Sequence, residues 1–285
     1  MQDSGTPQSI VVGIDGSRAA IRAALWAVDE AVSRDIPLRL LYAVDHADAE
    51  HLEPREAARK LAAADIAVRY AFTAVESTHK PVKIEVEITQ GSPVSSLVRA
   101  SGTAAMVCVG AVGCRHFQPG RVGSTAAAVA AKAHCPVAII RGDDSPGQSH
   151  QRWVVVETDA TPDNGVLLET AVLEARLRNA SLHAVTCWTA SSGDQQAGHR
   201  DGDQRVRAGL DRRLAQWRRR YPDLRAEVPV HGSILDYLGK NAPSVQLVVA
   251  GARDGGRVHE LTDPPGVAVL HHAACSVLIV DHHHL

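Results

Sequence analysis

The spacing of glycines in the first half of the chain is the pattern with the clearest chemical meaning. Gly110 and Gly113 are followed, after nine residues, by Gly123, Ser124 and Thr125. Glycines let the backbone come close to an anion and present its N–H groups to it. A helix that opens at Ser124 adds an N-terminal dipole that favours negative charge. The pattern therefore predicts a phosphate cradle.

Two arginines and the surrounding sequence limit the possible functions of this glycine loop. Arg115 and Arg121 lie inside it and could add charge-assisted contacts to a phosphate. No Gly-Lys-Ser/Thr follows, so it is not a Walker A loop, and the first strand is followed by Asp15-Gly-Ser17 instead of a dinucleotide fingerprint. Phosphoryl transfer by the P-loop route is unsupported. A plain tight turn after a strand is the alternative interpretation of the glycines.

The sequence contains an internal repeat. Matching residues of the two halves differ by 144, 141 and then 140 positions, as in Asp15/Asp159, Gly110/Gly251 and Cys135/Cys275. Self-similarity of this length, with offsets that change only in loops, indicates two copies of one domain. We expect a first domain over 1–142, a linker over 143–151 and a second domain over 152–285.

Short β-branched runs alternate with helical periods inside each copy. In the first copy, strands are expected over 9–14, 37–44, 82–88, 104–110 and 136–141, and helices near 17–34, 55–78, 92–100 and 124–133. Strands that are apolar on both faces suit a parallel sheet covered by helices on both sides. The expected fold class is α/β, with two tandem doubly wound, Rossmann-like sheets of five parallel strands.

Ligands of such sheets bind beyond the carboxyl ends of the strands, where the winding reverses. The residues at these ends are Asp15-Gly-Ser17, Ala43-Val-Asp45 and the loop from Gly110. Taken with His134-Cys-Pro-Val137 and the run Val12-Gly-Ile-Asp-Gly-Ser17, the long glycine spacing resembles the ATP-binding branch of the universal stress proteins, in the tandem form common in actinobacteria.

This resemblance covers almost the whole chain and implies an adenine-nucleotide α-hydrolase-like fold that binds ATP, AMP or a related adenine nucleotide, with Mg²⁺ accompanying ATP. It implies that Asp15 contacts the adenosine moiety and that Ala43 offers backbone groups to the adenine edge. The glycine loop would hold ribose and phosphates. The expected site comprises Gly13, Asp15, Ala43, Gly110, Gly113, Arg115, Gly123, Ser124 and Thr125.

The second copy departs from this pattern. It keeps Asp159, but Ala160 and Thr161 replace the Gly-Ser step, Asp254 stands in place of the second loop glycine, and Asp263-Pro264 replaces Gly-Ser. An acidic side chain repels phosphate, and proline removes an N–H donor at the helix start. Gly255 and Gly266 could rescue a shifted loop. We expect the second half to have a structural or dimerising role.

Composition excludes several classes of partner. The net charge is −2 with mixed signs, so no nucleic-acid or anionic-membrane footprint is present. The basic run Arg212 to Arg220 is interpreted as the solvated face of an amphipathic helix. The polar start and the absence of long apolar segments predict a soluble, cytoplasmic protein. The terminal His282-His-His284 lacks defined partner ligands, so no metal site is expected.

Three hypotheses about function remain. A binding module would hold an adenine nucleotide in the first half and use occupancy to bias conformation or partner binding during stress. An enzyme would be a slow ATPase using the same loop, although no catalytic arrangement of Ser, His, Cys and Asp follows from the spacing. A structural protein would form a homodimer through its last strands, 136–141 and 275–280.

Overall fold

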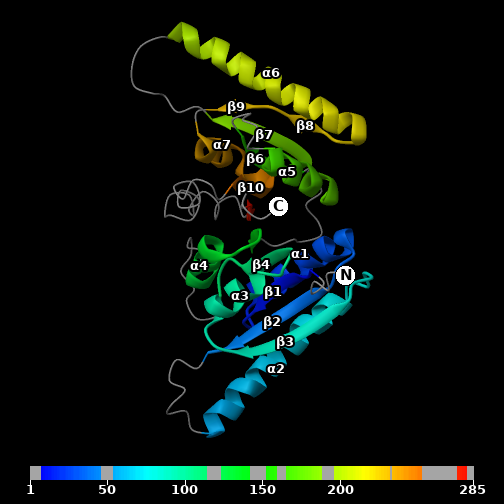
Figure 1. Ribbon diagram of the computed structural model, residues 1–285, viewed down its shortest axis with the longest axis vertical. Helices are drawn as coiled ribbons and strands as arrows, with labels where there is room; N and C mark the ends of the chain where they lie inside the picture. Colours follow the sequence, from blue (N-terminus) through cyan, green and yellow to red (C-terminus); the bar gives the residue numbers. More distant parts are fainter. Residues whose placement is uncertain are drawn as a thin grey trace, which may run out of the picture. The chain divides into compact units, whose positions relative to one another are not determined.

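The computed structural model describes residues 8–45, 54–113, 123–141, 152–158, 165–187, 196–231, 233–251 and 275–280 (Figure 1). The chain divides into two compact units, the first ending at Asp144 and the second beginning at Ser145. The expected linker, 143–151, lies outside the described residues. Each unit is a doubly wound, Rossmann-like α/β sheet, as expected from the sequence.

The first unit contains every strand and helix that the sequence predicts, with bounds that shift by two residues at most. Its elements are β1 (Ile10–Ile14), α1 (Arg18–Arg34), β2 (Leu38–Val44), α2 (Pro54–Glu76), β3 (Ile84–Gln90), α3 (Pro93–Ser101), β4 (Met106–Gly110), α4 (Ser124–Lys132) and β5 (Val137–Ile140). The β-branched runs became the strands because both faces of a central parallel strand are buried. Val11 and Val12 in β1, for example, are fully buried.

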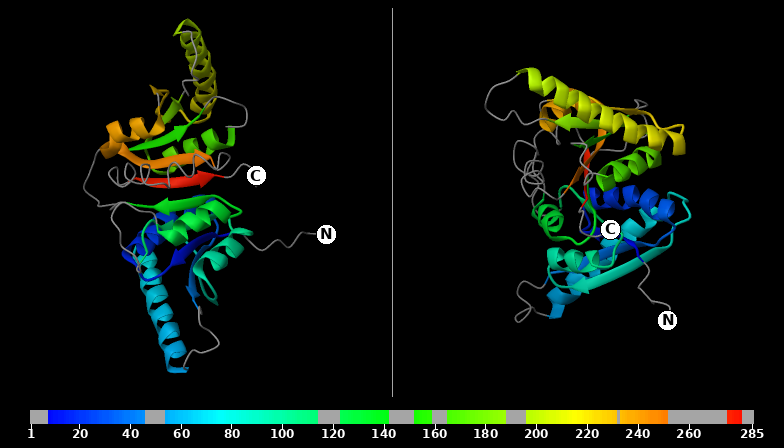
Figure 2. Two further views of the ribbon diagram at one scale, coloured as in Figure 1. Left: turned by 90° about the vertical axis from the view of Figure 1, so that its left-hand side faces the viewer. Right: turned by 45° about the horizontal axis from the view of Figure 1, so that its top comes forward.

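The strand order of the first unit is β3-β2-β1-β4-β5, and all of these strands pair in parallel. Helices α1 and α2 pack together, and α3 packs with α4, so that helices cover both faces of the sheet (Figures 1 and 2). The winding reverses between β1 and β4. This places the loops after β1, β2 and β4 at the edge of the sheet where ligands of such folds bind.

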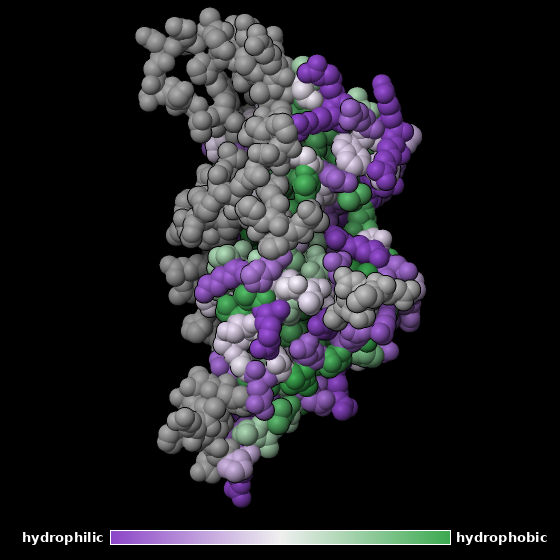
Figure 3. Space-filling model, in the orientation of Figure 1, coloured by the Kyte–Doolittle hydropathy of each residue, from purple (hydrophilic) through white to green (hydrophobic). Residues whose placement is uncertain are grey.

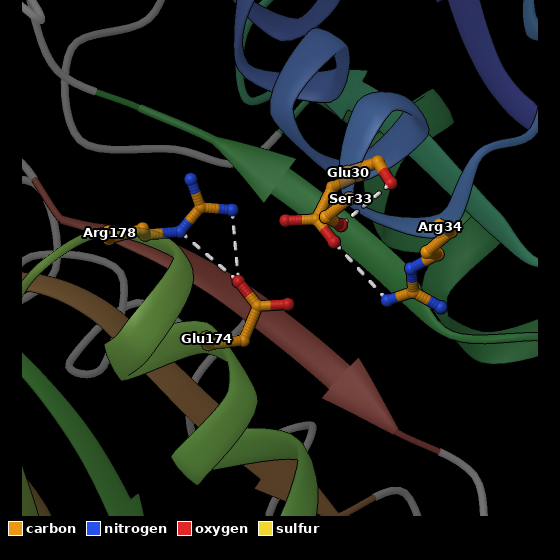
Figure 4. A network of polar contacts seen from close by, with 5 residues as sticks. All are labelled: Glu30, Ser33, Arg34, Glu174 and Arg178. Atoms are coloured by element: carbon orange, nitrogen blue, oxygen red, sulfur yellow. Dashed lines mark hydrogen bonds and ion pairs between the residues drawn. The ribbon is translucent and has the colours of Figure 1, made fainter. Parts of the chain in front are cut away.

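Helix α1 follows directly from the end of β1. Ser17 is its N-cap, and the hydroxyl oxygen accepts a hydrogen bond from Ala20 N at 3.1 Å. Near the other end, the carboxylate of Glu30 is almost fully buried and pairs with Arg34 at 3.2 Å (Figure 4). A buried carboxylate requires such a partner, and the spacing of four residues supplies it from the same helix.

The second unit repeats the topology. Its elements are β6 (Trp153–Glu157), α5 (Gly165–Leu177), β7 (Ser181–Cys187), α6 (Gln196–Arg220), β8 (Ala226–Glu227), β9 (Val230–His231), α7 (Ile234–Asn241), a 3-10 turn η3 (Ala242–Ser244), β10 (Val245–Gly251) and β11 (Ser276–Val280). The strand order is β11-β10-β6-β7-β8, with β9 also paired to β7. It matches the order of the first unit strand for strand.

The third strand is where the two copies differ in backbone. In the first unit, β3 pairs with β2 over seven residues without interruption. In the second unit the equivalent segment is split into β8 and β9, each two residues long, with Pro229 between them. Proline has no N–H to donate to a ladder, which explains why the strand breaks there.

An aromatic cluster of buried His183 and Tyr237 with half-buried Trp153 lies in the second unit. The ring of His183 stacks on Trp153 with centroids 4.0 Å apart, and its Nδ1 is 2.6 Å from the hydroxyl of Tyr237. Burial lowers the pKa of His183, and the negative charge of Glu227 opposes this shift. Burial, aided by Glu227, raises the pKa of Tyr237 to about 12. Around neutral pH, the cluster is therefore uncharged.

Cys135 and Cys275, which hold matching positions before the last strands, are buried core residues. Burial raises the pKa of the Cys135 thiol to about 12, against a smaller lowering by a backbone hydrogen bond at Val107. This thiol is therefore inert at neutral pH. Among the helices of the described part of the chain, none has the length and apolarity needed to span a bilayer.

Candidate functional site

A cavity of about 400 Å³ opens at the carboxyl ends of β1, β2 and β4 in the first unit. Its volume falls in the range of small-molecule binding sites. Eight of the nine residues expected from the sequence line it, namely Gly13, Asp15, Ala43, Gly110, Gly113, Gly123, Ser124 and Thr125. Arg115, the ninth, lies outside the described residues, as do Cys114 and Arg121.

Asp15 is held in place by the backbone around it. Its Oδ1 accepts a hydrogen bond from Ser17 N at 2.9 Å, which fixes the carboxylate at the start of α1. A Cβ atom added to Gly113 would lie 2.8 Å from Asp15 Oδ2. Only glycine allows the loop after β4 to approach the carboxylate this closely. The loops after β1 and β4 therefore meet at Asp15 and Gly113.

The other two strand-end glycines differ in how strictly packing requires them. A Cβ on Gly110 would lie 2.6 Å from the backbone carbon of Ala19, so any side chain there would push α1 away from β4. A Cβ on Gly13 would lie 3.1 Å from Leu97 Cδ1. Gly110 thus allows close approach of a helix, whereas the sequence pattern suggested that it allows close approach of a ligand.

Helix α4 points its N-terminus into the cavity. Gly123 is the N-cap and supplies no side-chain hydrogen bond, and its own N–H donates to Ala111 O at 2.7 Å. The backbone bonds of α4 begin with Ala127 N donating to Gly123 O, at 3.0 Å. The N–H groups of Ser124, Thr125 and Ala126 thus have no acceptor within their own helix. This arrangement suits an anion.

Several lining residues carried no signal in the sequence. The cavity wall includes apolar side chains from four different elements, Ile14, Leu41, Leu97 and Val109, together with Tyr42 and Pro93. Asp45, which the sequence placed at the end of the second strand, also lines the cavity, and its carbonyl oxygen accepts a hydrogen bond from Lys60 Nζ of α2 at 3.4 Å. Pro93 and Leu97 reach the site because α3 packs against β1. No local sequence motif predicts this placement.

The second unit has a different residue at the matching point of its first strand. Glu157 of β6 pairs with Val185, just as Gly13 of β1 pairs with Leu41. A carboxylate thus stands where the first unit has a glycine on the cavity floor. The other expected differences, at Thr161, Asp254 and Pro264, lie outside the described residues, as does Asp159.

Comparison with known proteins identifies the family of this chain. Residues 7–141 match the universal stress protein family. The universal stress protein Rv2028c of Mycobacterium tuberculosis is 55% identical to this chain over 286 residues, with both chains covered completely. The chain belongs to the universal stress protein family. Another member from the same organism, Rv3134c, is 44% identical, covering 95% of this chain and 97% of its own.

The solved structures agree on the fold. A universal stress protein from Archaeoglobus fulgidus superimposes with a TM-score of 0.69 over 96% of both chains, at 17% sequence identity. The similarity spans both units, so that protein shares the tandem α/β fold of this chain. Within the described residues, no group of three or more His, Cys, Asp or Glu side chains is placed to hold a metal ion.

Proposed function

We propose that the first unit of this universal stress protein binds ATP or a related adenine nucleotide and that occupancy regulates the protein during stress. The observation that carries the proposal is the convergence of Gly13, Asp15, Ala43, Gly113 and the start of α4 on one cavity. They come from four separate stretches of chain. The strand order brings these loops to one edge, and the carboxylate and the helix N-terminus found there supply groups that a nucleotide can use.

The cavity has two chemically different parts. Apolar side chains such as Leu41 and Val109 suit the faces of a purine, while the backbone of Gly113 and the N-terminus of α4 suit phosphates. The carboxylate of Asp15, held by Ser17 N, provides a fixed acceptor for ribose or base donors. When Mg²⁺ accompanies ATP, it would add charge neutralisation at the phosphates.

We propose that the second unit contributes architecture instead of a second nucleotide site. Glu157 would place negative charge and bulk where Gly13 leaves room. A nucleotide phosphate is itself negative, so a carboxylate in the cavity opposes binding. One nucleotide per chain is the expected stoichiometry.

Calorimetric titration of the full chain with ATP, AMP and cyclic AMP, with and without Mg²⁺, tests the proposal. Gly113→Glu should abolish binding because it puts a second carboxylate against Asp15. Asp15→Ala should abolish it by removing the fixed acceptor. Asp159→Ala, the matched control in the second copy, should leave the stoichiometry unchanged.

Other outcomes of these measurements would favour a different function or number of binding sites. Equal loss of binding from Asp159→Ala would overturn the single-site proposal. Phosphate release from ATP above the background of the Gly113→Glu variant would favour a slow ATPase. If neither binding nor release is detected, a structural role remains, and the homodimer expected through the last strands stays a prediction.

A further inference from the structure

β3 is the edge strand of the first unit. β3 ends the strand order there, and among the described residues no strand pairs on its outer side. Lys83 O accepts a hydrogen bond from Leu38 N, and Gly91 N donates to Val44 O, so the odd-numbered backbone groups face β2. The N–H and C=O groups that alternate with them face outward, at Ile84, Val86, Ile88 and Gln90.

Apolar side chains accompany these outward groups. Val86 is 50% exposed and Ile88 is 39% exposed, and hydrophobic residues gather over β3 and the adjoining part of α2 (Figure 3). Natural sheets protect such edges with charged side chains, of which β3 has Glu85 and Glu87, or interrupt them with prolines, breaks or very short strands. The second unit does so, since its third strand is split around Pro229, whereas β3 runs for seven residues without a break.

We propose that β3 is an interface at which two copies of this chain pair edge to edge, antiparallel, about a two-fold axis at Glu87. In this register Val86 lies opposite Ile88 of the second copy, twice, and both residues have outward backbone groups that form the hydrogen-bonded pairs of an antiparallel ladder. The occupant is a second copy because the strand is complementary to itself in this register.

Charge complementarity fixes the register. Arg99 of α3 is exposed, donates to Thr89 Oγ1 at 3.3 Å, and has no carboxylate partner among the described residues. The register places Glu85 of the second copy opposite Thr89 and therefore beside Arg99. Glu85 already pairs with Lys83 of its own chain at 2.8 Å, so Arg99 would be a second cation beside this carboxylate. Two such ion pairs would form. The two Glu87 carboxylates would face each other on the axis, and each is already paired with Arg39 of its own chain at 3.5 Å.

Sedimentation of the full chain over a range of concentrations tests the interface. The wild type should be dimeric at the upper concentrations, and Val86→Lys should raise the dimer dissociation constant at least about tenfold, which corresponds to about 1.4 kcal/mol. Val86 is exposed, so the fold should survive, which circular dichroism checks. Ile66→Lys, at a 68% exposed site on α2, is the matched control and should change nothing.

Charge reversal tests the register. Arg99→Glu should weaken the dimer about tenfold, and Glu85→Arg should do the same. The double variant should recover the wild-type constant, while Glu87→Gln should tighten the dimer by removing repulsion on the axis. A monomer at every concentration, or a dimer indifferent to Val86→Lys, would overturn the proposal. Failure of the double variant to recover would overturn the register. None of these results depends on nucleotide binding.

Discussion

The two units keep the same ion pair on the same helix but differ on the strand that leads into the cavity. Glu174 of α5 pairs at 2.9 Å with Arg178, the residue that follows the helix, as Glu30 pairs with Arg34 on α1 (Figure 4). By contrast, Gly13 of β1 is replaced by Glu157 in β6. The duplicated sequence has thus retained what the sheet and its helices need. It has changed what a ligand in the cavity would need.

The largest expected effect comes from copying the second unit's residue into the first. Gly13→Glu should abolish nucleotide binding, with a loss of at least about a hundredfold in affinity. The added Cβ would lie 3.1 Å from Leu97, and the carboxylate would then extend into the cavity. Calorimetry with ATP measures the loss.

The reverse change, Glu157→Gly, is its matched control. It should leave one nucleotide per chain, because the second copy also differs at Asp254 and Pro264. If Glu157→Gly creates a second nucleotide-binding event, Glu157 alone prevents nucleotide binding in the second unit. The functional difference between the two units would then rest on this one residue.

The shared ion pairs should differ in the stability that they provide. The Arg178 side chain is 10% exposed and that of Arg34 is 39% exposed. Removing a buried partner leaves a carboxylate with less compensation, so Arg178→Ala should cost about 3 kcal/mol. Arg34→Ala should cost less, about 1 kcal/mol, because the exposed place of the arginine side chain can be taken by water that hydrates the buried Glu30 carboxylate.

Urea unfolding followed by hydrogen exchange and mass spectrometry measures these costs, since it reports α1 and α5 separately. Lysine substitutions at the same two positions serve as conservative controls and should recover part of each loss. Equal costs at the two sites would show that exposure of the arginine does not decide the strength of the pair.

The smallest expected effect is a difference in pH dependence. His183 on β7 occupies the register position that Arg39 occupies on β2. Because burial lowers the pKa of His183 in the folded chain, the unfolded chain binds more protons as the pH falls through 6.5. The stability of the second unit should therefore be full above that pH and should decrease below it, toward the lowered pKa.

His183→Asn should flatten this dependence. Unfolding free energies at about pH 7.5 and 5.5, read by exchange at β7 and β2, measure the contrast. The first unit should show no corresponding loss at β2, because this strand contains no histidine. If the unfolding free energy of the His183→Asn variant changes with pH as it does in the wild type, groups other than His183 cause the pH dependence.

The sequence predicted the elements of the first unit well because its signals are local. Runs such as Met106 to Val109 are apolar on both faces, and the N-cap Ser17 marks the start of α1. The glycine spacing likewise predicted which loop reaches the cavity. These features depend on residues that are close together in the chain.

The rest depended on contacts between distant residues. Leu97 and Pro93 reach the cavity because α3 packs on β1, and the role of Gly110 depends on how closely Ala19 approaches β4. The break at Pro229 could have been expected from the residue type, but the exposed edge of β3 follows only from the strand order. Packing between elements has no local signature in a single sequence.

The residues at the start of α4 affect how readily the first turn of this helix opens. A helix whose N-cap residue offers no side-chain acceptor frays more readily at that end, and Gly123 is such a residue. An anion resting on the first turn would act as the missing cap. Slower amide exchange at Ser124 to Ala126 would then accompany occupancy, so that the ligand would complete the helix as a structural component of the protein.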